Sequence, residues 1–361
     1  MLQITMTRTA STLAVNQPQM AIDNVCAWPN LTLMPDGEVV ALLHNQPSHL
    51  LWEGDIDCWT SEDGGATWGR RGVAALHEPG TNQGHIAAGV GHNGDLIAIT
   101  SGHTNRPAPG TAPAEVPAFE SGRITDPWVN RSADGGRTWQ TAKHNFLQRG
   151  ASSSVLIPYG DIHRLGNGTL AACMYHQRDP IARTGPNNRE ACDSHVLRSQ
   201  DDGATWAEPS LIGRDLTETA MLAVDDQRWL AAARTHDAGN EQRLDLYQSD
   251  DAGRTWQYRQ PLTAAHQHPA HLLRLAGGAI VLTYGIRNEG LRGLGRRISH
   301  DGGQTWSRPA FLLDFGQGGP DLGYPSSVQL DDGDVLTAFY ARKATWHGRY
   351  HMGVLRWRLP A

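Results

Sequence analysis

Side chains that can transfer protons or hold charged groups stand just before and just after six similar apolar segments of the chain. Those that precede the segments include an indole, imidazoles, a carboxylate and a phenol: Trp28, His85, His163, Glu218, His271 and Tyr324. Those that follow them include Tyr175, Arg234 and Arg287. One such residue alone is most often the solvated start of a loop. A full set at corresponding positions instead predicts a site for ligand binding and proton transfer.

The six segments that would position these residues share one pattern: an apolar run, a tight turn and a second apolar run. The copies are LTLMPDGEVVALL, IAAGVGHNGDLIAI, IHRLGNGTLAACM, AMLAVDDQRWLAAA, LLRLAGGAIVLTY and SVQLDDGDVLTAF. Asp-Gly, Asn-Gly and Gly-Gly pairs between such runs are strong signals of an antiparallel hairpin. The sequence therefore predicts six hairpins.

A second repeat, an octapeptide of the form S-x-D-x-G-x-T-W, follows five of these hairpins. It spans 61–68, 132–139, 199–206, 249–256 and 299–306, with steps of 71, 67, 50 and 50 residues between its tryptophans. Such spacing predicts repeated supersecondary units. Asp is expected to cap backbone N–H groups, Gly to take angles closed to other residues, and Trp to bury its ring between units. Calcium binding is disfavoured because the spaced carboxylates and closing Glu of a calcium loop are missing.

Six hairpins and five octapeptides predict an all-β fold, a six-bladed β-propeller that forms a single domain over residues 1–361. The strand-like segment 4–15 is expected to pair with the C-terminal run YHMGVLRWRL and to close the last blade without a free edge. In such a fold the first strand of each blade lines the central axis. The polar residues that precede the hairpins are therefore expected to meet at one end of that axis.

The octapeptides resemble the Asp-boxes, or BNR repeats, of the sialidase (neuraminidase) superfamily, and the resemblance extends from about Cys26 to Leu359. It implies a sialidase-like propeller and a glycoside hydrolase that removes a terminal sugar, sialic-acid-like or other, from a glycan. The octapeptides themselves specify the fold rather than the function, because they occupy outer turns and one fold hosts many chemistries.

Three segments are similar to the sialidase active-site pattern and imply roles for particular residues. TETAMLAVDDQRWLAAARTHD carries Glu218 and Arg234 at the places of a family Glu and a substrate-binding Arg. DLGYPSSVQL carries Tyr324 at the place of the nucleophile. Near the fifth octapeptide, Arg292 fits the third substrate arginine best and Arg287 second.

Charge explains why a tyrosine is paired with a glutamate. An anionic substrate repels a carboxylate nucleophile, whereas a phenol stays neutral until a neighbouring Glu takes its proton, so sialidases depart from the two-carboxylate rule. An arginine cluster then holds the substrate carboxylate. The competing interpretation makes Glu218 and Arg234 only a buried ion pair, but their expected place on one rim with Tyr324 favours the catalytic interpretation.

Several features depart from the sialidase pattern. Ala27, in CAWPNL, stands where the first substrate arginine of the family belongs. Pro325 separates Tyr324 from the Ser that follows it in the family. Either Glu53 or Asp55, in HLLWEGDIDCW, is expected to be the catalytic acid/base. The missing arginine predicts a substrate other than ordinary sialic acid.

Two other functions remain open. A polysaccharide lyase acting on uronate-containing glycans would use His163 or Tyr175 as acid or base, and the histidine-rich rim and the missing arginine favour it. A non-catalytic glycan-binding propeller would explain the incomplete catalytic set. For the hydrolase, substrate contacts are expected from Trp28, His85, His163, Tyr175, His271, Arg234, Arg287 and Arg292.

The sequence has 17 histidines, and QHPAH places His268 and His271 three residues apart. Hydrogen bonds to sugar hydroxyls, or proton transfer, are favoured over metal binding at these positions, and neither a metal nor another cofactor is expected.

The charge composition of the chain disfavours some classes of binding partner. A net charge of −6 without a basic block disfavours nucleic acids and anionic membranes, which leaves a carbohydrate as the expected partner. None of the four cysteines forms a CxxC pair, and the N-terminal segment has no long apolar stretch. We therefore expect a cytoplasmic protein with reduced cysteines, or a periplasmic or secreted one if a leader has been removed.

The Pro-rich inserts 106–123 and 178–194 are expected to be loops over the pocket or against another subunit, and the oligomeric state is not predicted.

Overall fold

The computed structural model describes residues 14–15, 17–26, 28–110, 123–143, 146, 156–177, 192–235 and 241–359. Over these residues the chain consists of β-strands and turns without a helix, so the predicted all-β class is confirmed. None of them forms a helix long and apolar enough to cross a membrane. Ala27 and most of the two Pro-rich inserts lie outside the described residues.

Most strands belong to antiparallel units of four that are consecutive in the chain. The first unit contains β3 (Asn30–Leu33), β4 (Val39–His44), β5 (Ile56–Ser61) and β6 (Gly69–Ala75). The second contains β7 (His85–Val90), β8 (Leu96–Ser101), β9 (Trp128–Ser132) and β10 (Gln140–Ala142). The third contains β11 (Leu156–Arg164), β12 (Leu170–Gln177), β13 (Cys192–Ser199) and β14 (Ala207–Arg214).

The second half of the chain continues the pattern. The fourth unit contains β15 (Leu216–Ala223), β16 (Trp229–Thr235), β17 (Leu244–Ser249) and β18 (Gln257–Pro261). The fifth contains β19 (Gln267–Arg274), β20 (Ile280–Ile286), β21 (Arg292–Ser299) and β22 (Ala310–Gly316). The last unit takes three strands from the C-terminal end, β23 (Leu322–Gln329), β24 (Val335–Ala341) and β25 (His351–Arg358).

Each predicted hairpin is present as the first two strands of a unit. The pairs are β3–β4, β7–β8, β11–β12, β15–β16, β19–β20 and β23–β24. A short parallel pairing of β7 with β11, at Ala87–Gly160 and Ala88–Asp161, joins the second and third units into one eight-stranded sheet.

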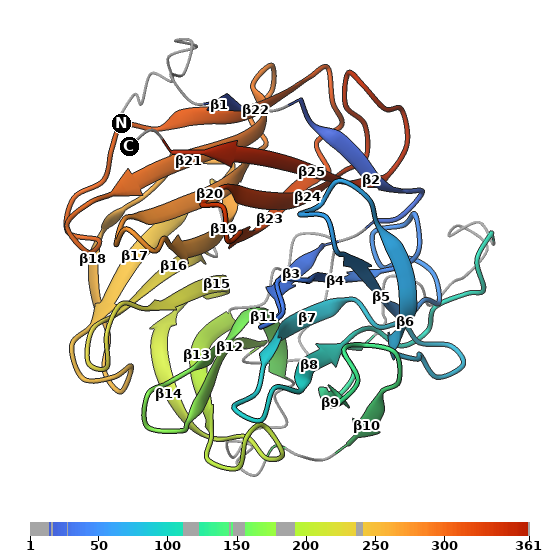
Figure 1. Ribbon diagram of the computed structural model, residues 1–361, viewed down its shortest axis with the longest axis horizontal. Coiled ribbons are helices and arrows are strands. Elements are labelled where there is room, and N and C mark those ends of the chain that lie inside the picture. Colours follow the sequence, from blue (N-terminus) through green and yellow to red (C-terminus); the bar gives the residue numbers. More distant parts are fainter. Residues whose placement is uncertain are drawn as a thin grey trace.

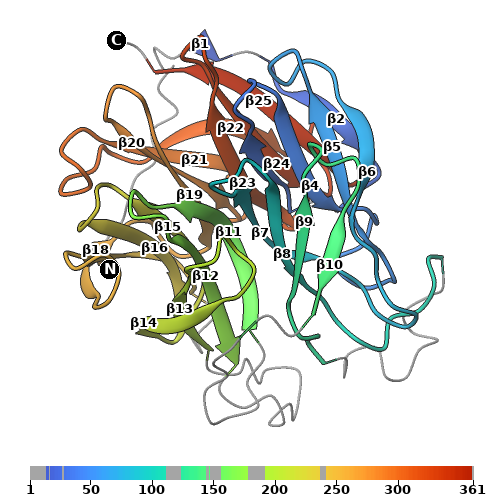
Figure 2. The ribbon, with the colours of Figure 1, turned by 60° about the horizontal axis from the view of Figure 1, so that its bottom comes forward.

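The last unit is completed by the N-terminal end of the chain. Of the segment 4–15 that was expected to pair there, residues 14–15 are described, and β1 (Ala14–Val15) pairs with β25. The longer partner of β25 lies just beyond that segment, in β2 (Gln19–Asp23). Figure 1 and Figure 2 both show β1 and β2 against β25. The edge of β25 is therefore covered, as expected.

The first strands of the units lie nearest the centre of the molecule, and the fourth strands lie at its periphery (Figure 1). Contacts between neighbouring first strands run from β3 to β7, β11, β15, β19 and β23, and from β23 back to β3. The residues at corresponding ends of these strands therefore face one another across the centre.

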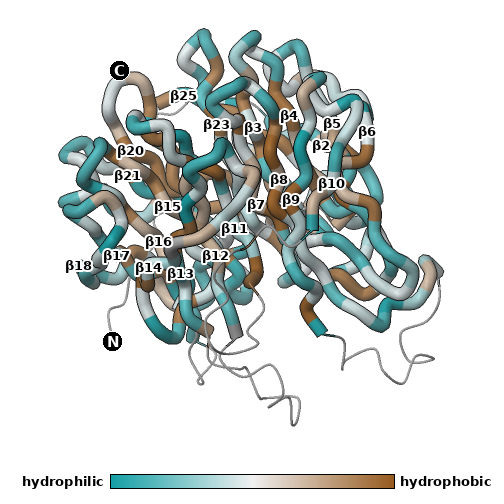
Figure 3. The backbone as a smooth tube through the Cα atoms, turned by 90° about the horizontal axis from the view of Figure 1, so that it is seen from below, coloured by the Kyte–Doolittle hydropathy of each residue, from teal (hydrophilic) through white to brown (hydrophobic). Residues whose placement is uncertain are grey.

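The apolar core lies between neighbouring units rather than within one. Leu43 of the first unit clusters with Leu336 of the last, and Leu230 of the fourth unit clusters with Leu282 of the fifth. Figure 3 shows hydrophobic strands between hydrophilic outer turns. The four cysteines are buried, and no disulfide links them. Because each unit completes the core of its neighbour, one unit alone would leave an apolar face exposed.

Each octapeptide forms the turn between the third and fourth strands of its unit, and the five turns share one hydrogen-bond pattern. Ser61 donates to the Asp63 carboxylate at 2.8 Å, Thr67 donates to the same carboxylate at 2.6 Å, and Trp68 Nε1 donates to the Gly65 carbonyl at 3.0 Å. The pattern recurs at 132–139, 199–206, 249–256 and 299–306.

Two details of these turns go beyond the expectation. The Thr hydroxyl binds the Asp carboxylate, a role for Thr that the sequence pattern alone does not show. Of the octapeptide tryptophans, Trp206 is fully buried and the other four are half-buried. Gly65 has a φ of 91°, and a Cβ there would lie 2.6 Å from Leu336 of the neighbouring unit. Glycine is therefore required both by backbone angle and by close packing between units.

Candidate active site

A cavity of about 260 Å³ lies where the first strands of the six units meet. Each first strand contributes at least one lining residue: Asn30, His85, Tyr159, Glu218, His271 and Tyr324. These residues are spread over nearly 300 positions of the chain, and the central ring of strands brings them together. The cavity thus collects aromatic, imidazole and carboxylate groups at one place, which is typical of a ligand site.

Tyr324, Glu218 and Arg234 form a connected group at this cavity. The Tyr324 hydroxyl donates a short hydrogen bond to Glu218 Oε1, across 106 residues of sequence. Arg234 Nη1 pairs with the other oxygen of Glu218, and Arg234 Nε donates to Gln242 Oε1 at 3.0 Å. The side chains of Glu218 and Arg234 are only 11% and 16% exposed. Both carboxylate oxygens of Glu218 are therefore satisfied.

Electrostatics assign different protonation states to Tyr324 and Glu218. Burial alone would raise the pKa of Glu218, but Arg234 and the Tyr324 hydroxyl hold it below its usual range. Burial, together with the Glu218 charge, raises the pKa of Tyr324. The pair is therefore a neutral phenol that donates to an ionised carboxylate, and the arginine compensates the buried negative charge.

The backbone of β23 is irregular at the point where it presents Tyr324. The pairing of β23 with β24 shifts register between Gly323 and Ser326. Gly323 has a φ of 108°, and Tyr324 has a φ of 50°, which is uncommon for a bulky residue. Pro325 then resumes the strand, and the Ser326 hydroxyl accepts a hydrogen bond from the Leu31 backbone at 2.9 Å. Strained backbone of this kind gathers at functional sites.

Arg287 and Arg292 occupy different environments. Arg287 donates from Nε and Nη2 to the Leu322 carbonyl at 3.1 and 2.9 Å, and its guanidinium lies 5.6 Å from the centre of the Tyr324 ring. Arg292 donates to the Gly318 carbonyl and has no such contact with Tyr324, while neither arginine is among the residues that line the cavity. The arginine beside the phenol is therefore Arg287.

Trp28 joins several of the lining residues into one aromatic wall. Its indole stacks on His85 with a centroid distance of 6.2 Å and an interplanar angle of 8°. The same indole meets His49 edge-on at 4.7 Å and the Tyr324 ring at 5.7 Å. An apolar wall of this kind can pack against the face of a sugar ring, while polar groups around it orient the hydroxyls.

The histidines at the cavity differ in their hydrogen-bond partners. Burial lowers the pKa of His85 to about 4, and its Nε2 has no hydrogen-bond partner within the described part of the chain. His271 Nε2 lies 3.0 Å from Asp161 Oδ2. Burial alone would raise the pKa of Asp161, but the interaction with His271 helps to hold that pKa below its usual range. His85 is thus a neutral hydrogen-bonding group, and His271 is held by a carboxylate.

Comparison with known proteins identifies the family of this chain. Residues 115–336, more than half of the chain, match the family model described as a BNR repeat-like domain. The chain belongs to the BNR repeat-like family. The sialidase from Micromonospora viridifaciens is 25% identical over 305 residues, which cover 77% of this chain and 44% of that protein. The BNR repeat-like chain thus spans less than half the length of that curated relative, and the predicted relationship to the sialidase superfamily is confirmed.

Solved structures of similar fold accompany this family assignment. A protein of unknown function from Dyadobacter fermentans is 20% identical with a TM-score of 0.77, covering 97% of this chain and all of that one. The Hadza microbial sialidase Hz136 is 18% identical with a TM-score of 0.71, covering 95% and 69% of the two chains. Trypanosoma rangeli sialidase in complex with the inhibitor DANA is 16% identical with a TM-score of 0.66, covering 93% and 55%. These similarities show a shared fold.

The structure of this BNR repeat-like chain gathers most of the predicted site residues. Around the cavity or bonded to its lining are Tyr324, Glu218, Arg234, Arg287, Trp28, His85, His271 and Tyr175. Arg292, the first choice for the third substrate arginine, bonds to Gly318, whereas Arg287, the second choice, lies beside the Tyr324 ring. The reason is local: Arg287 follows the end of β20 beside β23, whereas Arg292 begins β21 and bonds to Gly318.

The two acid/base candidates are held elsewhere. Glu53 accepts a hydrogen bond from the Gly80 backbone at 2.6 Å, and Asp55 accepts from the His77 backbone at 2.9 Å and contacts His77 Nδ1 at 2.6 Å. Neither lines the cavity. Their carboxylates instead tie the loop before β5 to the segment that follows β6.

His163 also lies away from the cavity lining. It follows Ile162 on β11, and its ring forms a hydrogen bond with the Met221 backbone. Burial lowers its pKa. The register of β11 shifts between Tyr159 and Ile162, so Tyr159 rather than His163 is turned toward the cavity.

Among the lining residues that the sequence analysis missed as site candidates are His49, Arg106 and Tyr159. Tyr159 stands in the apolar run that precedes the third hairpin, where an aromatic residue is expected in any strand. Arg106 begins the first Pro-rich insert, and His49 lies in the loop after β4. No spacing in the sequence marks the two loop residues, because loops after a second strand have no fixed length.

Proposed function

We propose that this chain is an exo-acting glycoside hydrolase in which Tyr324 and Glu218 form the nucleophile pair. The observation that carries the proposal is the hydrogen bond from the buried Tyr324 phenol to the Glu218 carboxylate at the cavity. A purely structural ion pair between Glu218 and Arg234 would not need a tyrosine at this position. It would also not need the uncommon backbone angle at Tyr324.

The chemistry follows from the two protonation states. As the Tyr324 oxygen attacks the anomeric carbon, its proton passes to Glu218, and the new C–O bond replaces the bond to the leaving sugar. Arg287 lies against the phenol ring and, with Arg234, favours the developing phenolate. A neutral nucleophile is the group of choice where the sugar carries negative charge.

The size and lining of the cavity support a single terminal sugar. A volume of about 260 Å³ falls just below the range of roughly 300–1,000 Å³ that holds drug-sized ligands. Arg106 is the one arginine among the described residues that line the cavity. Its guanidinium would bind an acidic substituent of that sugar. The substrate is thus a terminal sugar, with an acidic group expected on the side of Arg106.

We also propose that the units are the six blades of one β-propeller domain over residues 1–361. The closed run of contacts between first strands and the apolar clusters between neighbouring units support this. A single cooperative unfolding transition by calorimetry and by intrinsic tryptophan fluorescence is expected, because no blade has a core of its own. Separate transitions would argue for more than one domain.

The test compares Tyr324→Phe and Glu218→Gln with a matched control, Tyr258→Phe, on aryl glycosides of neutral and acidic sugars and on acidic oligosaccharides. Tyr258 is half-exposed on the peripheral strand β18, so its variant should keep wild-type activity. Glu218→Gln should lose about 10²–10⁴-fold in kcat, the contribution of a positioned base. Tyr324→Phe should lose at least as much.

The outcome separates the proposal from its competitors. Full activity of Tyr324→Phe on the substrate that the wild type hydrolyses would overturn it. Ultraviolet absorbance from a new C=C bond in the product would indicate a lyase. Saturable binding of a glycan that is recovered unchanged would indicate a binding protein.

A further inference from the structure

The proposed hydrolase needs a proton donor for the leaving sugar, and the two carboxylates expected in that role are engaged elsewhere. Glycoside hydrolysis uses an acid on the side of the leaving oxygen in addition to the nucleophile. The donor must face the cavity, have a partner that fixes its orientation and keep one proton-carrying atom available. His49 is the residue of the cavity lining that meets all three requirements.

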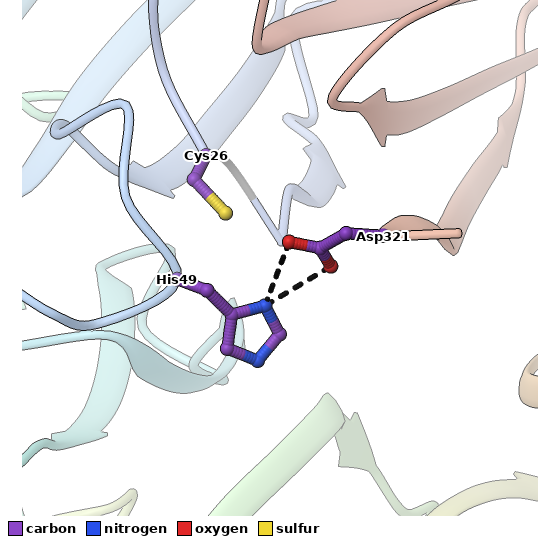
Figure 4. A group of neighbouring side chains, drawn as sticks. All are labelled: Cys26, His49 and Asp321. Atoms are coloured by element: carbon purple, nitrogen blue, oxygen red, sulfur yellow. Dashed lines mark hydrogen bonds and ion pairs between the residues drawn. The ribbon is translucent and has the colours of Figure 1, made fainter. Parts of the chain in front are cut away.

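His49 is oriented by Asp321, which lies 272 residues away in sequence. Its Nδ1 lies 3.0 and 3.1 Å from the two oxygens of the Asp321 carboxylate. Figure 4 shows the other ring nitrogen pointing away from Asp321, and no described residue bonds to it. The His49 side chain is 48% exposed and lines the cavity, so a ligand there can reach the imidazole ring.

Asp321 is itself held in place from three sides. The Tyr340 hydroxyl donates to one of its oxygens and the Tyr350 hydroxyl to the other. Burial opposes ionisation, but His49, Tyr340 and Tyr350 hold the pKa of Asp321 well below its usual range. An ionised carboxylate at Nδ1 fixes the proton on that nitrogen, leaving Nε2 to accept or donate the mobile proton.

His49 and the nucleophile share one wall of the cavity. The Trp28 indole contacts both the His49 ring, at 4.7 Å, and the Tyr324 ring, at 5.7 Å. His271 also pairs with a carboxylate, but its bonded nitrogen is Nε2 and its Nδ1 is buried. Of these two histidine–carboxylate pairs, only the one at His49 leaves an exposed nitrogen for proton transfer.

We propose that His49 is the general acid/base of the reaction and that Asp321 is its positioning residue, an inference that rests on the proposed function. In the first step His49 Nε2 gives its proton to the glycosidic oxygen as that C–O bond breaks. Tyr324 forms the new bond to the anomeric carbon and passes its own proton to Glu218. In the second step neutral His49 takes a proton from water, and the water oxygen bonds to the anomeric carbon. The Tyr324–carbon bond then breaks, and Glu218 returns the proton to the phenolate.

A metal ion is the other use that the surroundings of His49 allow. Cys26 Sγ, a His49 nitrogen and an Asp321 oxygen lie within 4.8 Å of one another (Figure 4). Burial raises the pKa of the Cys26 thiol well above its ordinary value, which disfavours the thiolate that a metal needs. The existing bond between His49 Nδ1 and Asp321 also occupies the atoms that a metal would bind. These observations favour the proton-transfer pair.

The experiment measures how the effect of His49→Ala depends on the leaving group. Dinitrophenyl and methoxyphenyl glycosides of the sugar that the wild type hydrolyses present a good and a poor leaving group. The variant should lose about 10²–10⁴-fold in kcat/KM on the methoxyphenyl glycoside and far less on the dinitrophenyl one. Added azide should restore turnover of the dinitrophenyl glycoside and yield a glycosyl azide, because azide attacks the intermediate without base assistance. Asp321→Asn should show the same leaving-group pattern with a smaller loss.

Controls separate failure of this proposal from failure of the proposed function. His300→Ala, at an exposed turn, should match the wild type on both glycosides. An equal loss on both glycosides without azide rescue would overturn the role of His49 while leaving Tyr324 and Glu218 untouched. Activity of Tyr324→Phe would instead overturn the hydrolase mechanism itself. Loss of wild-type activity on chelation, restored by Zn²⁺, would replace the proton-transfer pair by a metal site. If His49→Ala is unfolded by circular dichroism, His49→Asn gives the same comparison.

Discussion

The guanidinium of Arg287 lies 5.6 Å from the centre of the Tyr324 ring, while Arg292 bonds to the Gly318 carbonyl outside the cavity lining. This relationship predicts unequal effects of one substitution at two neighbouring arginines. Arg287→Met should reduce kcat about 10-fold or more, because a cation near a developing phenolate is worth at least about 1–2 kcal/mol. Arg292→Met should leave kcat within a factor of a few. Steady-state kinetics on one glycoside measure both, and a larger loss at Arg292 would contradict the assignment.

Arg234 compensates a buried charge, so its removal should cost stability as well as activity. Arg234→Met leaves the Glu218 carboxylate buried without its main partner, which typically costs about 3–5 kcal/mol. Chemical denaturation should show this loss. The double variant Glu218→Gln with Arg234→Met should recover part of the stability, because the uncompensated charge is gone. A single variant as stable as the wild type would show that solvent replaces the arginine.

The octapeptide aspartates make stability fall in acid. Hydrogen bonds from the octapeptide Thr side chain and backbone lower the pKa of Asp63 and of Asp251 to about 2, below an unfolded value of about 3.9. The unfolded state binds more protons between these values, so their contribution is complete above about pH 4 and is lost as pH falls through 2. Denaturant midpoints at pH 4, 3 and 2.5 should decrease in that order. Asp63→Asn should be less stable at neutral pH and should show a flatter decrease.

His85 and His44 make stability fall at a higher pH. Burial lowers the pKa of each to about 4, below the unfolded value of about 6.5. Because the unfolded state takes up protons first, their contribution is present above about pH 6.5 and declines as pH falls toward 4. Resonances of both imidazoles should show no titration above about pH 5 by NMR. Titration of either near pH 6.5 would mean that water reaches the ring.

Much of the fold could be predicted because its signals are local. Asp-Gly, Asn-Gly and Gly-Gly turns mark five of the six hairpins, the fourth is recognised from its two apolar runs, and the octapeptide spacing identifies the repeated unit. The convergence of Glu218 and Tyr324 follows once first strands are assumed to meet at the centre. These inferences depend on repeats that occur five or six times, so no single position decides them.

The parts of the site that escaped prediction depend on loop geometry and long-range pairing. Glu53 was considered because of its place in the sequence, but its loop turns the carboxylate toward the Gly80 backbone. His49 and Asp321 become recognisable as a pair only once the first and last units are side by side. Tyr324 reaches the cavity through a bulge whose form the sequence does not specify beyond a glycine and a proline.

The proposed mechanism requires a covalent bond between Tyr324 and the sugar. The most direct measurement is to incubate the wild type with a fluorinated, activated glycoside of the sugar that it hydrolyses, so that the covalent intermediate accumulates, and to sequence the labelled peptide by mass spectrometry. One glycosyl group is expected on Tyr324, absent from Tyr324→Phe and present in Tyr258→Phe. A label on another residue, or inactivation without any label, would contradict it.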